Sequence, residues 1–178
     1  LAEATPKSVE YPFDITFLMS DASLKDGEGW STKPAISFSC GEFFEKAFDF
    51  NQTLTALPAG TYQFKGQAFQ RPGNTEDVYK AFTAGQDNVN VVIYAGDEEA
   101  KIQNIAAEAQ TKKLGGSETA VGSNPTRYVP NNMRAASFYF AAELYDNGVV
   151  TQLDEDDSKM KVGMRCEEVQ AAYWTIFD

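Results

Sequence analysis

The sequence has 178 residues, with 26 acidic side chains, 15 basic side chains and a net charge of -11. This length fits one domain with a sizeable core. The acidic excess would repel a phosphate backbone, so nucleic acid is not expected as a partner. Histidine is absent from the sequence, which excludes Ser-His-Asp and Cys-His catalysis and every histidine-ligated zinc or iron site. No apolar run approaches about eighteen residues, so we expect no direct membrane insertion.

The composition favours β structure. Thirteen phenylalanines and an aromatic content of 13% suit pleated sheet surfaces better than helix bundles. We therefore expect an all-β chain with one or two short helices. Residues 1–10 are small, polar and charged without periodicity and predict an N-terminal linker. Residues 11–178 then form a single β-sandwich domain.

Two short strands are expected near the start of this domain. Residues 11–19 and 35–40 each place apolar side chains at alternate positions, the pattern of a half-buried strand. Between them Trp30 follows a Gly-Glu-Gly loop. Its ring is interpreted either as a lid over the core or as an exposed stacking platform.

The stretch at residues 47–71 is expected to be a hairpin around which the domain is organised. Apolar and polar residues alternate on both sides of the segment 57–60, where a proline and a glycine favour a turn. We expect Thr55 to face Thr61 across this turn. In that register the core-facing pairs are Phe48 with Ala68 and Phe50 with Gly66.

The other face of this hairpin is predicted to be polar. It would set Asp49 and Asn51 beside Lys65 and Gln67. Gln52 alone breaks the apolar phase of the first strand. We expect its amide to hydrogen-bond nearby backbone, the alternative being a ligand contact.

The middle of the chain is predicted to contain one central strand and two loops. Residues 72–79 have little apolar rhythm and predict a loop, whereas residues 89–95 are the most continuously apolar and predict a central strand. Residues 97–109 fit either a helix or an extended segment. Residues 110–128 hold several glycines and serines and predict a mobile loop, without the spacing of a phosphate-binding motif.

The last third contains the clearest helix. Asn131 and Asn132 can cap a helix that starts at Met133, carries a stripe of apolar residues and ends at the Asn-Gly pair 147–148. A second hairpin is predicted from residues 149–153 and 159–165, with Met160, Val162 and Met164 facing inward. A final strand at residues 172–177 contains Trp174.

Two features could suggest metal or redox chemistry. The acidic segment 154–158 invites a calcium site, but Arg165 occupies the twelfth position from Asp154, where an EF-hand needs glutamate, so a solvated turn is expected. Cys40 and Cys166 are too few for a disulfide scaffold and lack the spacing of a metal knuckle. They form either one long-range bridge or two buried thiols.

Four segments together carry a resemblance to a known family: FDFNQTLTALPAGTYQFKGQAFQR, NNMRAASFYFAAELYDN, KVGM and the closing WTIFD. They resemble the jelly-roll domains of multidomain exported proteins of gut Bacteroidetes, which are similar to the galactose-binding-like superfold. The resemblance implies two antiparallel sheets packed face to face and a secreted, periplasmic or cell-surface location. Members usually continue past the final Asp with another hydrophobic segment, so we expect the domain to be truncated at its C-terminal strand.

The resemblance also implies an accessory role beside neighbouring domains of a larger chain, often with a glycan or polysaccharide ligand. Binding residues vary within the superfold, so no site is carried over from it. Aromatic rings and planar amide, carboxylate or guanidinium groups recognise sugars. The candidate ligand-binding residues are Asp49, Asn51, Gln67, Phe69, Arg71, Asn74 and Tyr79, with Trp30 and Tyr128 as more distant candidates.

Two alternatives to a non-catalytic carbohydrate-binding module stay open. The first is a structural or adhesion module that mediates contacts between proteins or domains. The second is a glycoside hydrolase or lyase, which would need two carboxylates at a set separation, and the sequence singles out no such pair. We favour a protein that is not an enzyme and that needs no cofactor or metal.

Overall fold

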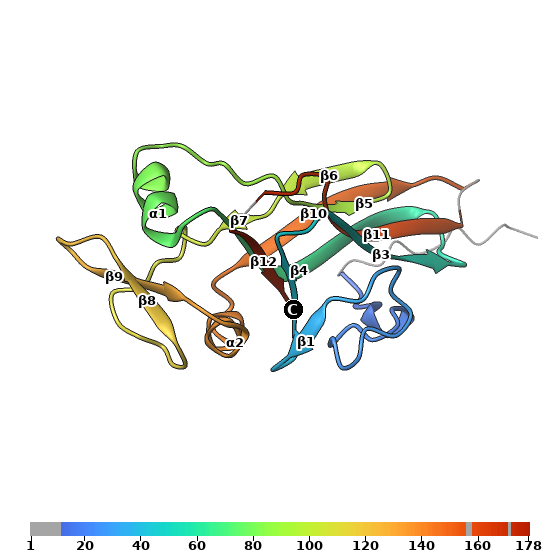
Figure 1. Cartoon of the computed structure of the whole chain (residues 1–178). Helices are drawn as coiled ribbons and strands as arrows, with labels where there is room; N and C mark the ends of the chain where they lie inside the picture. Colours follow the sequence, from blue (N-terminus) through green and yellow to red (C-terminus); the bar gives the residue numbers. More distant parts are fainter. Residues whose placement is uncertain (1–11, 156–157, 171) are drawn as a thin grey trace, which may run out of the picture.

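The computed structural model describes residues 12–155, 158–170 and 172–178. This part of the chain is mostly β, with two short helices and with six- and four-stranded sheets consistent with a β-sandwich (Figure 1). Neither helix of the described residues combines the length and hydrophobicity needed to cross a membrane. The predicted linker at residues 1–10 lies outside the described residues.

The six-stranded sheet has the order β1-β2-β12-β4-β10, and β7 adds to β4 in parallel. All its other neighbours are antiparallel. Its strands are β1 (Ala35–Ser37), β2 (Cys40–Phe44), β4 (Gly60–Pro72), β7 (Gln103–Asn104), β10 (Asp146–Leu153) and β12 (Tyr173–Phe177).

The four-stranded sheet has the order β3-β11-β5-β6 and is antiparallel throughout. Its strands are β3 (Phe48–Thr55), β5 (Val92–Ala95), β6 (Glu98–Lys101) and β11 (Lys159–Cys166). The remaining elements are the 3-10 turn η1 (Thr16–Leu18), the helices α1 (Thr75–Thr83) and α2 (Met133–Ala141), and a separate pair of strands, β8 (Glu118–Val121) and β9 (Arg127–Pro130).

The predicted hairpin at residues 47–71 is wrong in its pairing. Both strands form, but β3 pairs with β11 and β4 pairs with β10 and β12. Thr55 faces Lys159 and Thr61 faces Gln152, so the turn between them carries the chain from one sheet to the other. Alternation reports which face of a strand is buried but not which strand lies beside it.

The predicted second hairpin is wrong for the same reason. Its strands form as β10 and β11, which lie in different sheets. The expected inward side chains are nevertheless confirmed, since Met160, Val162 and Met164 are all buried. Of the acidic tip between these strands, residues 156–157 lie outside the described residues.

The main core lies between the two sheets. Phe48, Phe50 and Leu54 of β3 are buried in it, as their alternation predicts. Trp30 is a lid rather than a platform, because its ring stacks on Phe50 with centroids 4.0 Å apart and its Nε1 donates to the Asp21 carbonyl.

A second core lies on the outer side of the six-stranded sheet. Phe69 of β4 and Trp174 of β12 pack there against Tyr139, Phe140 and Tyr145, on and just after α2. The strands β8 and β9 add Val121 and Val129 to the same cluster. Figure 1 shows α2 and the β8–β9 pair beside β12 and β4, away from the four-stranded sheet.

Two predicted elements near the sheets change type. The described part of residues 11–19 is no strand, because Ile15 and Met19 both contact the main core at helical spacing around η1, while Phe13 and Phe17 are each 73% exposed. In the predicted loop at 72–79, Pro72 ends β4 and residues 75–79 are instead the start of α1, whose first turn is capped by the Asn74 side chain accepting from the Glu76 amide.

Other expectations are confirmed in part. The strand predicted at residues 35–40 forms as β1 and ends at Ser37, because positive φ values at Phe38 and Ser39 turn the chain into β2. The central strand forms over the shorter span of β5, and within residues 97–109 the extended alternative holds for β6 and β7, followed by turns at 105–108. The predicted mobile loop at 110–128 contains β8 and the start of β9, so it is wrong in that part.

The predicted helix at Met133 is confirmed, with the Asn132 side chain accepting from the Ala135 amide at 2.8 Å. It ends at Ala141 rather than near Asn147, because Glu143 has a positive φ of 53° that breaks the helical path. The final strand forms as β12. Cys40 and Cys166 are both free and buried, so the two-thiol alternative holds.

Candidate functional site

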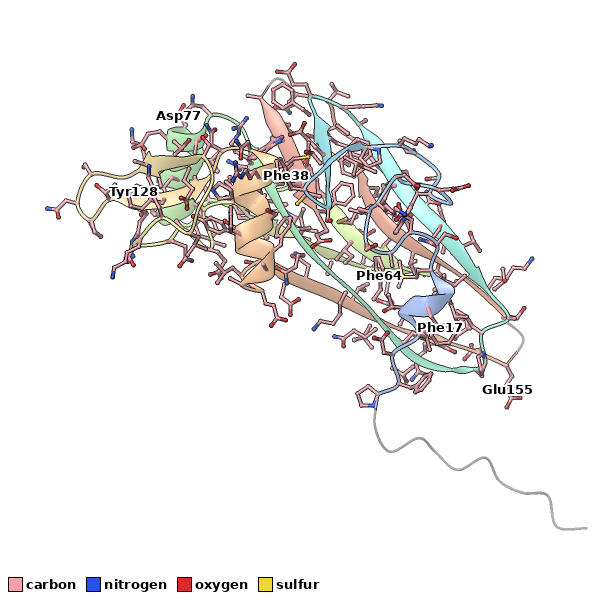
Figure 2. The ribbon with its side chains drawn as sticks, turned by 90° about the horizontal axis from the view of Figure 1, so that it is seen from below. Phe17, Phe38, Phe64, Asp77, Tyr128 and Glu155 are labelled. Atoms are coloured by element: carbon pink, nitrogen blue, oxygen red, sulfur yellow. The ribbon has the colours of Figure 1, made fainter. Side chains whose placement is uncertain are left out.

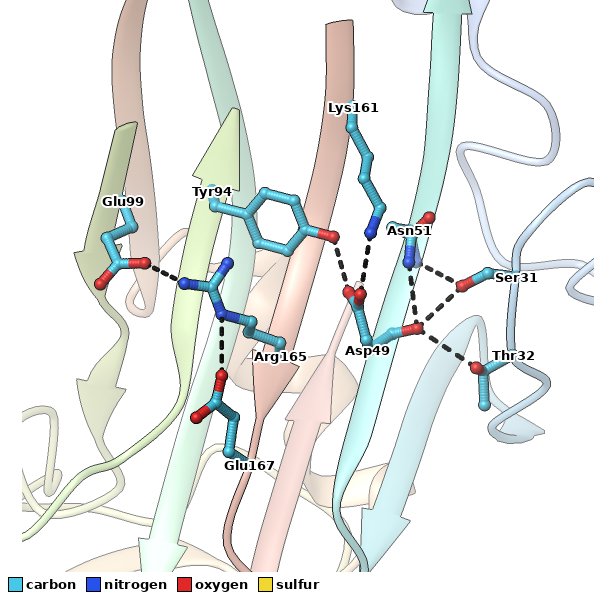
Figure 3. A network of polar contacts seen from close by, with 9 residues as sticks. All are labelled: Ser31, Thr32, Asp49, Asn51, Tyr94, Glu99, Lys161, Arg165 and Glu167. Carbon is cyan, nitrogen blue, oxygen red and sulfur yellow. Dashed lines mark hydrogen bonds and ion pairs between the residues drawn. The ribbon is translucent and has the colours of Figure 1, made fainter. Parts of the chain in front are cut away.

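The outer face of the four-stranded sheet carries a network of polar contacts (Figure 3). Asp49 comes from β3, Tyr94 from β5, Glu99 from β6, and Lys161 and Arg165 from β11. We call these five residues the Tyr94 face. They come from four strands that lie side by side, so each is held by a strand with partners on the sheet.

The Tyr94 ring crosses β11 at a glycine. Gly163 is paired with Asn51 on one side and with Tyr94 on the other. Figure 3 shows the Tyr94 ring extending across β11 toward Asp49, and its hydroxyl donates to Asp49 Oδ1 at 2.6 Å. A Cβ at position 163 would lie 2.2 Å from the Phe50 carbonyl oxygen, so this close approach of β3 and β11 requires glycine.

Two cations cover the ring of Tyr94. Lys161 Nζ lies 5.6 Å and Arg165 Cζ lies 5.0 Å from the ring centroid. Both distances are within the range of cation–π attraction. Tyr94 is only 3% exposed for this reason, although it points away from the sandwich interior. The ring therefore supports the two cations and has no open face of its own.

The Asp49 carboxylate is the centre of charge on β3. Lys161 Nζ lies 2.9 Å from its Oδ2. Partial burial acts to raise the pKa of Asp49, but hydrogen bonds from Tyr94 and Lys161 outweigh burial and lower it. Burial, followed by the hydrogen bond to Asp49, raises the pKa of Tyr94. At neutral pH Asp49 is therefore charged and Tyr94 is a proton donor to it.

Arg165 extends the network to the other edge of the sheet. Its Nη2 is paired with Glu99 Oε2, and its Nε lies 3.8 Å from Glu167 Oε1. A guanidinium has five N–H donors and an ammonium has three, while each carboxylate can accept about four hydrogen bonds. The Asp49–Lys161 and Glu99–Arg165 pairs are about half exposed, so their remaining donors and acceptors face water.

The loop before β1 anchors the β3 edge of this face. Ser31 Oγ donates to the Asp49 carbonyl at 2.8 Å and accepts from the Asn51 amide at 3.1 Å. Thr32 Oγ1 and Asn51 Nδ2 each donate to the same carbonyl at 3.2 Å. The orientation of Asp49 is thus set by its backbone as well as by its side-chain partners.

The structure brings together only two of the sequence-predicted residues, Asp49 and Asn51. Gln67 lies on the other sheet and donates to Asp146 Oδ1 at 3.0 Å. Phe69 has no exposed surface, and Arg71 stacks over the Trp174 ring at 5.1 Å. The predicted neighbourhood of Asp49 with Gln67 and Lys65 is therefore wrong.

The remaining predicted residues have local structural partners. Asn74 caps α1, and Tyr79 on that helix packs against the second core. Tyr128 in β9 lies under Lys113, whose Nζ is 5.5 Å from the ring centroid. Gln52 bonds the Ser20 backbone at both its amide and its carbonyl, as its sequence position predicts.

The sequence interpretation missed four members of the Tyr94 face. For Lys161 and Arg165 the signal is the alternation itself, because they and Gly163 alternate with the buried Val162 and Met164 and so share the outer side of β11. What that pattern does not contain is the order of the strands, which places Tyr94 and Asp49 on either side of β11.

The described residues contain no cluster of three or more acidic, cysteine or histidine side chains that could hold a metal ion. The carboxylate of Asp21 binds backbone amides of its own loop. Its oxygens accept from the amides of Lys25, Asp26 and Gly27 at 2.6 to 3.0 Å, which closes the loop before Trp30.

Comparison with protein-family models, with curated proteins and with solved structures gives no match to this chain.

Proposed function

We propose that this chain is a non-catalytic carbohydrate-binding or accessory module, of jelly-roll type, within a larger exported or cell-surface protein. The strand order supports the jelly-roll. Along the chain β2, β4, β10 and β12 belong to one sheet, and β3, β5, β6 and β11 to the other. The order β2-β12-β4-β10 in one sheet and β3-β11-β5-β6 in the other supports this part of the proposal, because a jelly-roll winds eight strands into two sheets as two Greek keys.

The observation that carries the binding proposal is the Tyr94 face. It gathers two cations and two carboxylates that are held in fixed orientation and keep unused hydrogen-bonding capacity toward water. Sugar hydroxyls bind such groups as both donors and acceptors, and charged partners make the stronger hydrogen bonds. Because the strands already fix these side chains, a ligand would order few new rotamers on binding.

This face is better suited to an extended polysaccharide than to a small buried ligand. The ring of Tyr94 is covered by Lys161 and Arg165, so recognition would come from polar contacts rather than from stacking on an open ring. The polar groups run across the sheet from Asp49 on β3 to Glu99 on β6, which spaces them for several sugar units.

The test is affinity electrophoresis of the protein in gels containing soluble neutral and acidic polysaccharides. We expect at least one polysaccharide to retard the protein and Lys161→Ala to weaken that retardation. Lys65→Ala is the matched control, because Lys65 pairs with Asp146 at 3.3 Å and with similar exposure on the other sheet. No retardation by any polysaccharide, or an equal loss in both variants, would contradict the proposal.

A second candidate function is a structural or adhesion module. It is favoured by an exposed apolar stripe beside α2, made of Phe138 on the helix, which is 41% exposed, and Phe38 in the turn between β1 and β2, which is 57% exposed. Arg134 lies one helical turn before Phe138 and has its Cζ 6.0 Å from the Phe38 ring centroid. Contacts with neighbouring domains through this stripe would be lost in Phe38→Ser, which can be measured by limited proteolysis of the larger protein.

A further inference from the structure

The orders of the two large sheets end at β1, β10, β3 and β6, and three of these edge strands are protected against pairing with another chain. β1 has only three residues, and β6 consists of charged residues apart from Ala100. The outer edge of β3 is covered at Asn51, whose carbonyl accepts from the Ser31 amide at 2.8 Å and whose amide donates to Ser31 Oγ at 3.1 Å. Short length, charge and a covering loop all protect the edge of a sheet.

The fourth edge strand, β10, lacks these protections. It has eight residues and pairs with β4 along its whole length. From Asn147 to Leu153 it contains no charged residue and no proline. Val150, near its centre, is 54% exposed. A long, uncharged edge strand with an exposed apolar side chain is a template for pairing with another chain.

Alternate residues of β10 direct their backbone groups away from β4. The Ala68 amide donates to the Tyr145 carbonyl at 3.0 Å, so the odd-numbered residues of β10 continue this pairing with β4. The N–H and C=O groups of Gly148, Val150 and Gln152 therefore face the outer side, and we call them the β10 edge. Among the described residues, no hydrogen bond reaches these backbone groups. Because Gly148 has no side chain, its exposed surface is backbone, so solvent reaches the edge there.

The residues at the two ends of the β10 edge are acidic. Asp146 precedes it, and Asp154 and Glu155 follow it. Lys65 lies 3.3 Å from the Asp146 carboxylate, whereas Asp154 and Glu155 form no ion pair with any other described residue. Figure 2 shows the Glu155 side chain at the tip where β10 ends, far from α2. The charge left for a partner is thus negative and lies at the C-terminal end of β10.

These charges decide against a second copy of the chain as the occupant of the edge. Each copy would carry a net charge of -11. In the symmetric antiparallel pairing centred on Val150, Asp146 of one copy would lie opposite Asp154 of the other, because both are equally far from that centre. Like charges directly opposite each other destabilise a sheet. A segment that is basic at one end matches this edge instead.

We propose that the β10 edge binds an extended segment of a partner polypeptide by antiparallel strand addition, and that this segment is basic at its N-terminal end. Antiparallel pairing sets that end beside Asp154 and Glu155. Main-chain hydrogen bonds to the β10 edge supply the affinity. The residue opposite Val150 lies on the same face as the Val150 side chain and is apolar. The proposal is independent of carbohydrate binding, because the Tyr94 face belongs to the other sheet.

Residue-resolved amide hydrogen exchange of the 178-residue chain, measured by NMR, is the first test. Without a partner, the amides of Gly148, Val150 and Gln152 should exchange fast, and those of Val149 and Thr151, which face β4, should exchange slowly. Slow exchange at all these amides at every protein concentration would mean that the chain itself covers the edge. Slow exchange that appears at the edge amides only at high protein concentration would mean that a second copy covers it. Either result would overturn the proposal.

The second test adds the peptide acetyl-Lys-Lys-Thr-Val-Val-Val-Thr-amide, whose fifth residue lies opposite Val150 when its first lies opposite Asp154. At about ten times its Kd, the peptide should slow exchange at the amides of the β10 edge about tenfold. N-methylation of its fifth residue removes a donor that faces β10, whereas N-methylation of its fourth removes a donor that faces away. We expect only the first of these changes to abolish the slowing. No slowing up to the solubility limit, or equal slowing by both methylated peptides, would overturn the proposal.

The charge of the partner is tested with the peptide acetyl-Glu-Glu-Thr-Val-Val-Val-Thr-amide, which differs only in its two N-terminal residues. At low ionic strength it should bind about tenfold more weakly, because its carboxylates would lie beside Asp154 and Glu155. The difference should narrow as added salt screens these charges. Equal affinity of the two peptides at low ionic strength would overturn the assignment of a basic partner.

Substitutions at Val150 give a third measurement. Val150→Pro removes an N–H that faces away from β4, so the protein should fold with a thermal midpoint close to that of the parent, while its affinity for the lysine peptide falls. Val150→Thr is the matched control, because it keeps both the N–H and a β-branched side chain, and its affinity should change little. Unchanged affinity in a folded Val150→Pro protein would contradict strand pairing at this edge.

Discussion

The two sheets have outer faces that share one alternating pattern but are covered in different ways. On the six-stranded sheet, the outward rings of Phe69 and Trp174 lie beneath α2 and the residues that follow it. On the four-stranded sheet, the outward ring of Tyr94 is covered by Lys161 and Arg165 from the neighbouring strand.

From this difference we infer that the outer face of the six-stranded sheet serves stability and that the Tyr94 face serves recognition. Covering a sheet with a helix buries apolar surface, which is the main source of folding free energy. Covering a ring with cations buries the ring but leaves the charged ends in water, where exposed ion pairs contribute little to stability. We therefore expect substitutions on the six-stranded side to affect folding and those on the Tyr94 face to affect binding.

The largest expected effect is on the free energy of unfolding, from a substitution on the outer face of the six-stranded sheet, which α2 covers. Phe69→Ala should lower the free energy of unfolding by about 3–5 kcal/mol, because Phe69 is fully buried and its loss leaves a cavity. Urea denaturation measures this value. Phe138→Ala on the exposed side of α2 is the comparison and should cost less than about 1 kcal/mol. Similar losses in the two variants would show that the second core is not tightly packed.

A smaller loss of stability should come from removing a polar group in the same second core. The Tyr145 hydroxyl donates to the Ile105 carbonyl at 2.6 Å in a fully buried position. Tyr145→Phe leaves that carbonyl without its partner and should cost about 1–3 kcal/mol in thermal or urea unfolding. Tyr62→Phe is the matched control, since its hydroxyl donates to the Pro58 carbonyl at the same distance but in an exposed position. The interpretation fails if both variants lose equal stability.

The alternating pattern of a strand predicts the direction of its side chains but not the strand that lies beside it. Alternation correctly places Phe48, Phe50 and Val162 inside, because a period of two fixes the side to which a side chain points. It does not place Thr55 opposite Lys159, because the strand beside β3 is separated from it by about a hundred residues of chain whose packing decides the order.

The start of α1 shows that a capping signal can be a better guide than apolar rhythm. Asn74 is followed by acidic residues at the positions that favour a helix start, yet the weak apolar pattern of residues 72–79 suggests a loop. The helix at Met133 was found because its cap and its apolar stripe agree. Agreement between independent local signals is thus a better guide than either signal alone.

The candidate site was predictable only as separate strands. Asp49 follows from the polar side of β3, whereas Tyr94 lies in a segment whose apolar run hides its outward direction. The sequence gives no signal of the role of Gly163, because the close approach that requires a glycine there exists only once β3 lies beside β11.

The smallest predicted effect is the pH dependence of stability that comes from Asp49 on the Tyr94 face. Asp49 has a lowered pKa in the folded state, so its charge contributes stability above the unfolded-state pKa of about 3.9, and that contribution is lost as the pH falls through the folded value. Asp49→Asn should therefore be less stable than the parent at pH 7, by less than about 1 kcal/mol because the Lys161 pair is half exposed. The difference in thermal midpoint should narrow as the pH falls below about 3.9. A difference that stays constant across this range would assign the effect to packing of the Tyr94 hydroxyl rather than to the charge of Asp49, and the two outer faces would then differ less than we infer.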